Sequence, residues 1–286
     1  MDQQALIKDV SSISPAELAA FQHASMMSLD EILPLLRSPD TSKTLAWNSN
    51  FASLSDGSFD YPVLNGSPVL YPAYAAELLK GMVASGVELE CSGDSRLQYF
   101  LLSKIKQAGE ITASHENVHA QRHFHRMREF VTDLSGSVLD VGCDNVALSS
   151  SLFPESCRYV GLDPFCQSAG VRIIGVGESL PFKSGTFDNV VFNTSLDHIL
   201  DYYLALKEAL RVLKPGGTLV LVTLCWTDRE SLLSDSVHFH HFKRYEINGA
   251  LQDLGFDVVA AKNYSYKDDE FRYGLYLKAK KRDDGL

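Results

Sequence analysis

Residues 137–163 read SVLDVGCDNVALSSSLFPESCRYVGLD, and this stretch decides the fold. An apolar strand pattern, SVLDVG, is followed by a short helix pattern through Leu152 and by a second strand pattern, YVGLD. The alternation continues with FDNVVFN, a helix that ends at RVLKPGG, and the strand TLVLVT. Apolar strands separated by helices predict an α/β fold, with an open, mostly parallel sheet and helices on both faces.

Acidic residues stand where the first two strands end. Asp140 and Gly142 lie at the first exit, and Asp163 closes the second strand, 21 residues after Gly142. Open α/β sheets bind ligands outside the carboxyl ends of their strands. Glycine lets the backbone approach a ligand, and an acidic group at this spacing accepts hydrogen bonds from ribose hydroxyls. The exits predict a nucleoside ligand, the alternative for Asp163 being a helix N-cap.

Together with FDNVVFNTSLDHI and EALRVLKPGGTLVLVT, these exits resemble the class I S-adenosylmethionine-dependent methyltransferase family. The resemblance implies a Rossmann-like sheet and S-adenosylmethionine as cofactor. It implies that Asp140 and Gly142 hold the methionine end, that Asp163 holds the ribose, and that Glu178 lies near the adenine. Asn193 would face the sulfonium and the acceptor. The full implied set of cofactor-binding residues is Asp140, Gly142, Cys143, Asp163, Pro164, Gly177, Glu178 and Asn193.

Three residues depart from the family pattern. Asp144 and Val146 stand where the family usually has glycines, and Val176 stands where an acidic residue commonly contacts the adenine amine. An aspartate adopts a left-handed conformation at modest cost, so Asp144 can preserve the turn. Val146 fits only if its backbone is ordinary helix.

Asp197 and His198 follow the fourth predicted strand and are the candidate catalytic residues. Histidine acts as a base near neutral pH, and an adjacent carboxylate can orient it. The alternative is a capping aspartate and a packed histidine. The run HFHHF, residues 238–242, offers His238, His240 or His241 as a further lining of the acceptor pocket, or as loop histidines at the sheet edge.

The N-terminal region predicts short helices after Ser14 and Ser28, each with a capping box, and then a small β unit. Asp56-Gly57 and Asn65-Gly66 between apolar runs are hairpin signals. This stretch resembles the small zinc-ribbon-like family of the tRNA-methyltransferase activator subunit, but no cysteine lies near residues 37–40. We therefore expect a zinc-free domain that binds a protein partner or packs on its neighbour, or a β extension without separate function. The expected division is residues 1–72 for this domain, 73–113 for a helical linker and 114–286 for the methyltransferase domain.

Composition narrows the ligand classes. A net charge of −10 argues against bulk nucleic acid as partner. The five cysteines are scattered without a C-x-x-C pair, and His119 and His123 lack an acidic third ligand, so no metal site is expected. No run of 18 apolar residues occurs and the N-terminus lacks a signal-peptide pattern, which predicts a cytoplasmic protein without membrane contact.

These observations predict a methyltransferase that acts on a small-molecule acceptor, with a hydroxyl group of a sugar or secondary metabolite as the preferred acceptor. One alternative is a pseudoenzyme in which the fold serves as a partner-binding or regulatory module, as the three departures suggest. A second is a protein or tRNA methyltransferase, suggested by the activator-like N-terminus.

Overall fold

The structure is a computed structural model that describes residues 24–49, 52–64, 66–73, 118–144, 146–164, 173–227, 238–266 and 269–282. The helix expected after Ser14 lies outside these residues, as does nearly all of the expected linker.

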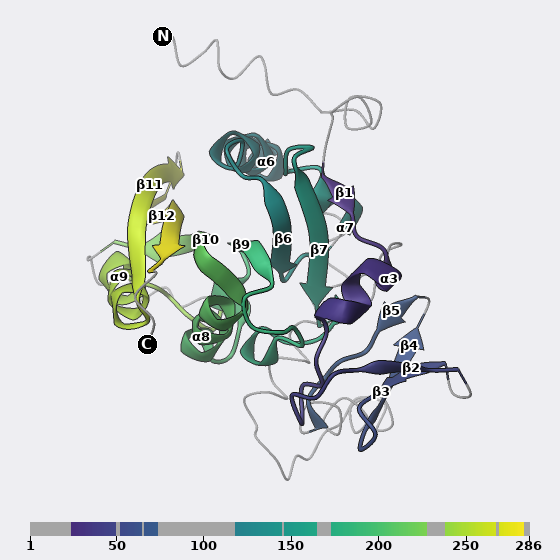
Figure 1. The fold of residues 1–286 in the computed structure, drawn as a ribbon. Helices are drawn as coiled ribbons and strands as arrows, with labels where there is room; N and C mark the ends of the chain where they lie inside the picture. The colour runs from purple at the N-terminus through teal and green to yellow at the C-terminus, as the bar shows by residue number, and fades with distance from the viewer. Residues whose placement is uncertain are drawn as a thin grey trace, which may run out of the picture.

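An eight-stranded sheet forms the centre of the molecule, in the order β1-β7-β6-β9-β10-β12-β11 with β8 beside β7 (Figure 1). The pairs β1–β7, β7–β8, β6–β7, β6–β9 and β9–β10 are parallel, whereas β12 runs antiparallel to β10 and β11. The strands are β1 (Ser25–Met26), β6 (Gly136–Val141), β7 (Cys157–Asp163), β8 (Ile173–Ile174), β9 (Phe187–Asn193), β10 (Leu213–Trp226), β11 (Phe256–Tyr266) and β12 (Asp269–Lys281). The open, mostly parallel sheet predicted from the sequence is confirmed.

Helices cover both faces of this sheet because its central strands are apolar on both sides. Leu139 and Phe192 point into a core that also holds side chains of α8 and α9, whereas Val138 and Val191 point into a second core with α6 and α7. The helices on these faces, within the described residues, are α6 (Val118–Phe130), α7 (Val146–Ser150), α8 (Tyr202–Val212) and α9 (Arg244–Asp253). No helix in the described ranges is long and apolar enough to cross a membrane.

The predicted N-terminal β unit is present as a four-stranded antiparallel sheet, β2-β3-β4-β5. Gly57 adopts a φ of 84° in the turn between β3 and β4, and the Asp56 carboxylate accepts hydrogen bonds from the N–H groups of Ser58 and Phe59. The Ser28–Glu31 capping box is also found. The elements are α3 (Leu29–Ile32), the 3₁₀ helix η1 (Leu33–Leu35), β2 (Ala46–Asn48), β3 (Ser53–Ser55), β4 (Asp60–Leu64) and β5 (Ser67–Pro68). Its likeness to a zinc-ribbon-like domain is not confirmed.

The β unit packs directly on the main sheet. Its residues Leu36, Leu54 and Leu70 belong to the same apolar core as Leu139 and Phe192. Backbone pairing adds to this contact, because isolated bridges join residue 36 to 182 and residue 69 to 174. Figure 1 shows the unit below the lower ends of β6 and β7.

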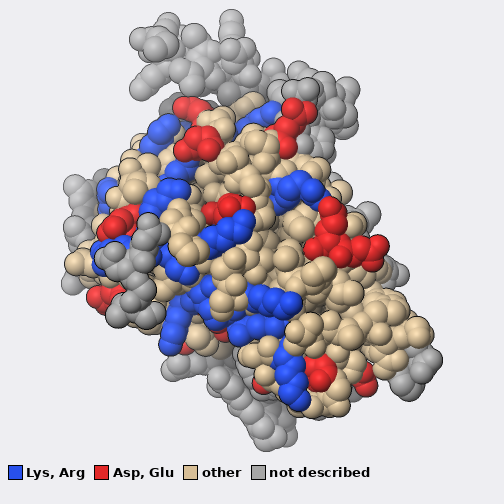
Figure 2. Space-filling model, viewed as in Figure 1, with Lys and Arg blue, Asp and Glu red and all other residues tan. Residues whose placement is uncertain are grey.

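The charge of the chain is unevenly spread. Figure 2 shows Lys and Arg side chains gathered over the middle of one face, beside separate groups of Asp and Glu. The formal charge of −10 therefore coexists with a local basic area, and the absence of bulk nucleic acid as partner stays a prediction.

Candidate functional site

The strand order reverses at β6, which lies between β7 and β9, and such a switch point is where open α/β sheets bind ligands. The exits of β6 and β9 touch there. Gly142 has a φ of 80°, and a Cβ at this position would lie 2.5 Å from the Cβ of Ser195. The Ser195 hydroxyl in turn donates to the carbonyl of Val141 over 2.5 Å. Glycine is thus required at 142 by the neighbouring strand exit alone.

The exits of β6 and β7 are joined by hydrogen bonds. The Asp163 carboxylate accepts from the N–H of Asp144 over 2.9 Å, and the N–H groups of Gly142 and Cys143 both donate to the carbonyl of Leu162. Asp144 takes a φ of 46°, as expected of an aspartate that preserves the turn. Val146 is the buried first residue of α7, so its backbone is ordinary helix, as a valine at this position requires.

Asp140 is fully buried behind this loop. One carboxylate oxygen accepts from the Tyr159 hydroxyl over 2.9 Å, whereas Oδ1 has no hydrogen-bond partner among the described residues. The pKa of Asp140 is raised to about 7, mainly by burial; the hydrogen bond from Tyr159 opposes this rise and the charge of the nearby Asp163 adds to it. A buried carboxylate with an unused acceptor suits an ammonium group, such as that of the methionine end of the expected cofactor.

Asn193 is the last residue of strand β9, and the side chain of His123 on helix α6 bonds to it. Nε2 of His123 on α6 lies 2.8 Å from Oδ1 of Asn193, and Nδ1 lies 2.6 Å from the Tyr276 hydroxyl. Desolvation and the charge of Arg126 lower the pKa of His123, while the bond to Asn193 opposes them. A neutral ring with its proton on Nε2 satisfies both contacts. Sequence reasoning weighed His123 as a metal ligand against a solvated or packed histidine and missed this contact, because no sequence signal connects α6 to the end of β9.

The other expected cofactor-binding residues lie around the same edge. Cys143 is buried beside Gly161, and the carbonyl of Pro164 accepts a hydrogen bond from Tyr71. Gly177 opens the 3₁₀ helix η2 (Gly177–Ser179), and a Cβ there would lie 2.9 Å from the Ile199 side chain. The Glu178 carboxylate accepts from the N–H groups of Leu200 and Asp201 and so braces the start of α8. Contact of Gly177 or Glu178 with adenine stays a prediction.

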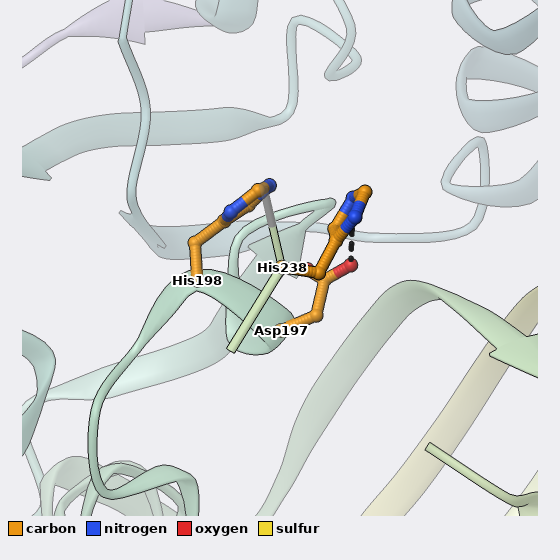
Figure 3. A group of neighbouring side chains, drawn as sticks. All are labelled: Asp197, His198 and His238. Carbon is orange, nitrogen blue, oxygen red and sulfur yellow. Dashed lines mark ion pairs between the residues drawn. The ribbon is translucent and has the colours of Figure 1, made fainter. Parts of the chain in front are cut away.

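Asp197 and His198 belong to the 3₁₀ helix η3 (Leu196–His198) after β9, and the structure brings His238 to them (Figure 3). Nε2 of His238 lies 3.6 Å from Oδ2 of the buried Asp197. The rings of His198 and His238 stack with centroids 4.7 Å apart. One ligand atom from each of the three residues lies within 4.8 Å of the others, so the cluster can share a proton or hold a cation.

Backbone contacts fix this cluster. The main-chain carbonyl of Asp197 accepts from the N–H groups of Phe239 and His240, which ties the segment after β10 to η3. The other two histidines of the HFHHF run point elsewhere. Nε2 of His240 lies 2.8 Å from the carbonyl of Ile199, and His241 packs edge-on against Trp226.

Comparison with known proteins agrees with this architecture. A methyltransferase domain family matches residues 113–261. The demethylmenaquinone methyltransferase of Staphylococcus haemolyticus is 32% identical over 111 residues, which cover 34% of this chain and 46% of that protein. That of Staphylococcus aureus strain JH9 is 39% identical over 69 residues, which cover 24% and 29%. The chain therefore spans less than half the length of these curated relatives.

Among solved structures, the 1,6-didemethyltoxoflavin-N1-methyltransferase of Burkholderia thailandensis, with bound 1,6-didemethyltoxoflavin and S-adenosylhomocysteine, gives a TM-score of 0.54. The match covers 69% of this chain and 94% of that one at 16% identity, which shows a shared fold. The strand order and the strand-end site define a Rossmann-like α/β protein of the methyltransferase type. The chain belongs to the methyltransferase domain family, as predicted from its sequence.

Proposed function

We propose that this chain transfers the methyl group of S-adenosylmethionine to a small organic acceptor. The observation that carries the proposal is the pair of buried carboxylates at the strand exits, Asp140 with an unused acceptor oxygen and Asp163 beside the β6 loop. Family membership supports the reaction type, and relatives named for demethylmenaquinone and 1,6-didemethyltoxoflavin support a small acceptor.

The chain would hold S-adenosylmethionine by the two polar ends of the cofactor, the ammonium group and the ribose. Asp140 would accept hydrogen bonds from the ammonium group and Asp163 from the ribose hydroxyls, since carboxylates accept strongly from charged and hydroxyl donors. When bound, S-adenosylmethionine supplies a methyl group on an already activated leaving group. The remaining tasks of the protein are to align the acceptor and to take its proton.

The cluster of Asp197, His198 and His238 would take that proton. It lies after β9 and β10, at the carboxyl edge of the sheet next to Asn193, where the acceptor is expected. A neutral imidazole accepts a proton, and the Asp197 carboxylate 3.6 Å from His238 stabilises the charge that develops. A hydroxyl acceptor fits this arrangement, because methylation of a hydroxyl oxygen requires loss of its proton.

Calorimetric titration with S-adenosylhomocysteine tests the proposal. We expect wild-type protein to bind it, and Asp163→Ala to weaken binding by about 1 to 3 kcal/mol through loss of the ribose contact. The exposed Asp257 on β11, which pairs with Arg282, offers a matched control, and Asp257→Ala should bind as wild type. No binding by the wild-type protein would refute the proposal and favour the pseudoenzyme.

A further inference from the structure

Tyr71 contacts the part of the site where the nucleoside is expected, although it lies outside the matched methyltransferase domain. The methyltransferase match begins at residue 113, so residue 71 lies in the N-terminal unit, outside the matched range. Tyr71 is buried and packs with Ile174 and Val176 in a small apolar cluster. Its hydroxyl donates to the carbonyl of Pro164, the residue directly after Asp163.

Backbone contacts bring the N-terminal unit to the same place. The N–H of Leu70 donates to the carbonyl of Ile174 over 2.7 Å, and residue 69 pairs with residue 174 in a parallel bridge. Strand β8 is therefore held between β7 on one side and residues 69–70 on the other. This pairing fixes the chain just before Val176, at the edge expected to receive the adenine.

A second contact braces the following segment. The Glu208 carboxylate on α8 accepts from the N–H of Leu180 over 2.9 Å and pairs with Arg37 of the N-terminal unit and with Arg211. The backbone N–H of Arg37 also donates to the carbonyl of Pro181 over 3.0 Å, so the N-terminal unit contacts the chain after Asp163 through Tyr71 and the chain after η2 through Arg37.

We infer that the N-terminal β unit forms part of the cofactor site, with Tyr71 as a positioning residue that holds Pro164, and through it Asp163, in place for the adenosine moiety. The inference rests on the proposed function. Burial of the Tyr71 ring supplies packing, and its hydroxyl supplies the bond that sets the main chain after Asp163. Loss of the hydroxyl alone should therefore weaken nucleoside binding while most of the packing remains.

The test compares two buried tyrosines of the same unit. Tyr61 is also buried, and its hydroxyl bonds to Ser38 and Asp40. Calorimetry is carried out with S-adenosylhomocysteine and with adenosine. We expect Tyr71→Phe to lower the affinity for both ligands by roughly three- to tenfold, which corresponds to the loss of one hydrogen bond. Tyr61→Phe should bind both as wild type. In a double-mutant cycle, the effect of Tyr71→Phe should shrink in the Asp163→Ala background, because Tyr71 acts through Asp163.

Each other outcome overturns the inference. Binding by Tyr71→Phe within twofold of wild type would make Tyr71 a packing residue, and equal losses in Tyr61→Phe would show general destabilisation. Additive effects of Tyr71→Phe and Asp163→Ala would show that Tyr71 does not act through Asp163. A wild-type protein that binds neither ligand would refute the proposed function itself, which separates the two failures.

Discussion

Cofactor binding should depend on pH through Asp140. Burial raises the pKa of this carboxyl from 3.8 to about 7, so it carries a proton over much of the range below neutrality. A protonated carboxyl cannot hold an ammonium group as an ion pair, and binding must therefore expel the proton. About one-tenth of Asp140 is ionised near pH 6 and about nine-tenths near pH 8, so the apparent dissociation constant of S-adenosylhomocysteine should fall about tenfold between them.

Stability gives a second readout of the same group. The folded state keeps the Asp140 proton up to about pH 7, whereas the unfolded chain loses it near its ordinary pKa of 3.8. The contribution of Asp140 to the free energy of unfolding is therefore full below that ordinary value and is lost as pH rises through about 7. A bound ammonium group compensates the buried charge, so the ligand should raise the melting temperature more near pH 8 than near pH 6.

Among the described residues, the titratable groups that act on Asp140 are the Tyr159 hydroxyl and the Asp163 carboxylate, both on β7. The pKa of Tyr159 is raised well above 10 by burial, so this hydroxyl does not titrate in the range. Calorimetry at several pH values should show the tenfold change in the wild type and in Asp257→Asn, and a flat, weaker profile in Asp140→Asn. A flat wild-type profile, or an unchanged slope in Asp140→Asn, would refute the reasoning.

Three further predictions address the fold, the cluster and metal content. Gly142→Ala should lower the free energy of unfolding by about 1 to 3 kcal/mol, because the new Cβ would meet Ser195. Gly249 lies at an open position of α9, and Gly249→Ala should raise the free energy of unfolding by up to about 1 kcal/mol. Urea unfolding measures both changes. Once an acceptor is found, His198→Ala and His238→Ala should each lower turnover roughly 10²- to 10⁴-fold and leave the affinity for S-adenosylhomocysteine unchanged. The exposed His125 serves as control, and His125→Ala should turn over as wild type. Wild-type turnover in His198→Ala or His238→Ala would assign that residue to packing. Elemental analysis should find no stoichiometric zinc, since residues 37–40 lack cysteine. If the protein instead held one metal ion tightly and His238→Ala lost it, the cluster would be a metal site and not a proton acceptor.

The fold could be predicted because its signals are local. Apolar strands, the helices between them and turn pairs such as Asp56-Gly57 each act over a few residues, and the structure confirms the parallel sheet and the hairpin. The conformations of Asp144 and Val146 followed from the steric limits of single residues.

Contacts between distant segments could not be predicted in the same way. His238 reaches Asp197 only because the segment after β10 returns across η3, and Tyr71 reaches Pro164 only because the N-terminal unit packs on the β7 side. Such contacts depend on strand order and on the path of connections, which a single sequence specifies only through the whole fold. The sequence did identify the residues at the strand exits, because exit position is itself a local property.

The strand order divides the site into two parts that meet where Ser195 packs on Gly142 and bonds to the carbonyl of Val141. Asp140 and Asp163 stand at the exits of β6 and β7, and the cluster around Asp197 stands beyond β9. Gly142 and Ser195 touch where the two parts join, so a displacement of one exit is transmitted to the other by direct steric contact. Variants at Asp163 should therefore act mainly on cofactor affinity and variants at His238 mainly on turnover. Variants at Gly142 or Ser195 should change both together, because they alter the distance between the bound cofactor and the group that takes the acceptor proton.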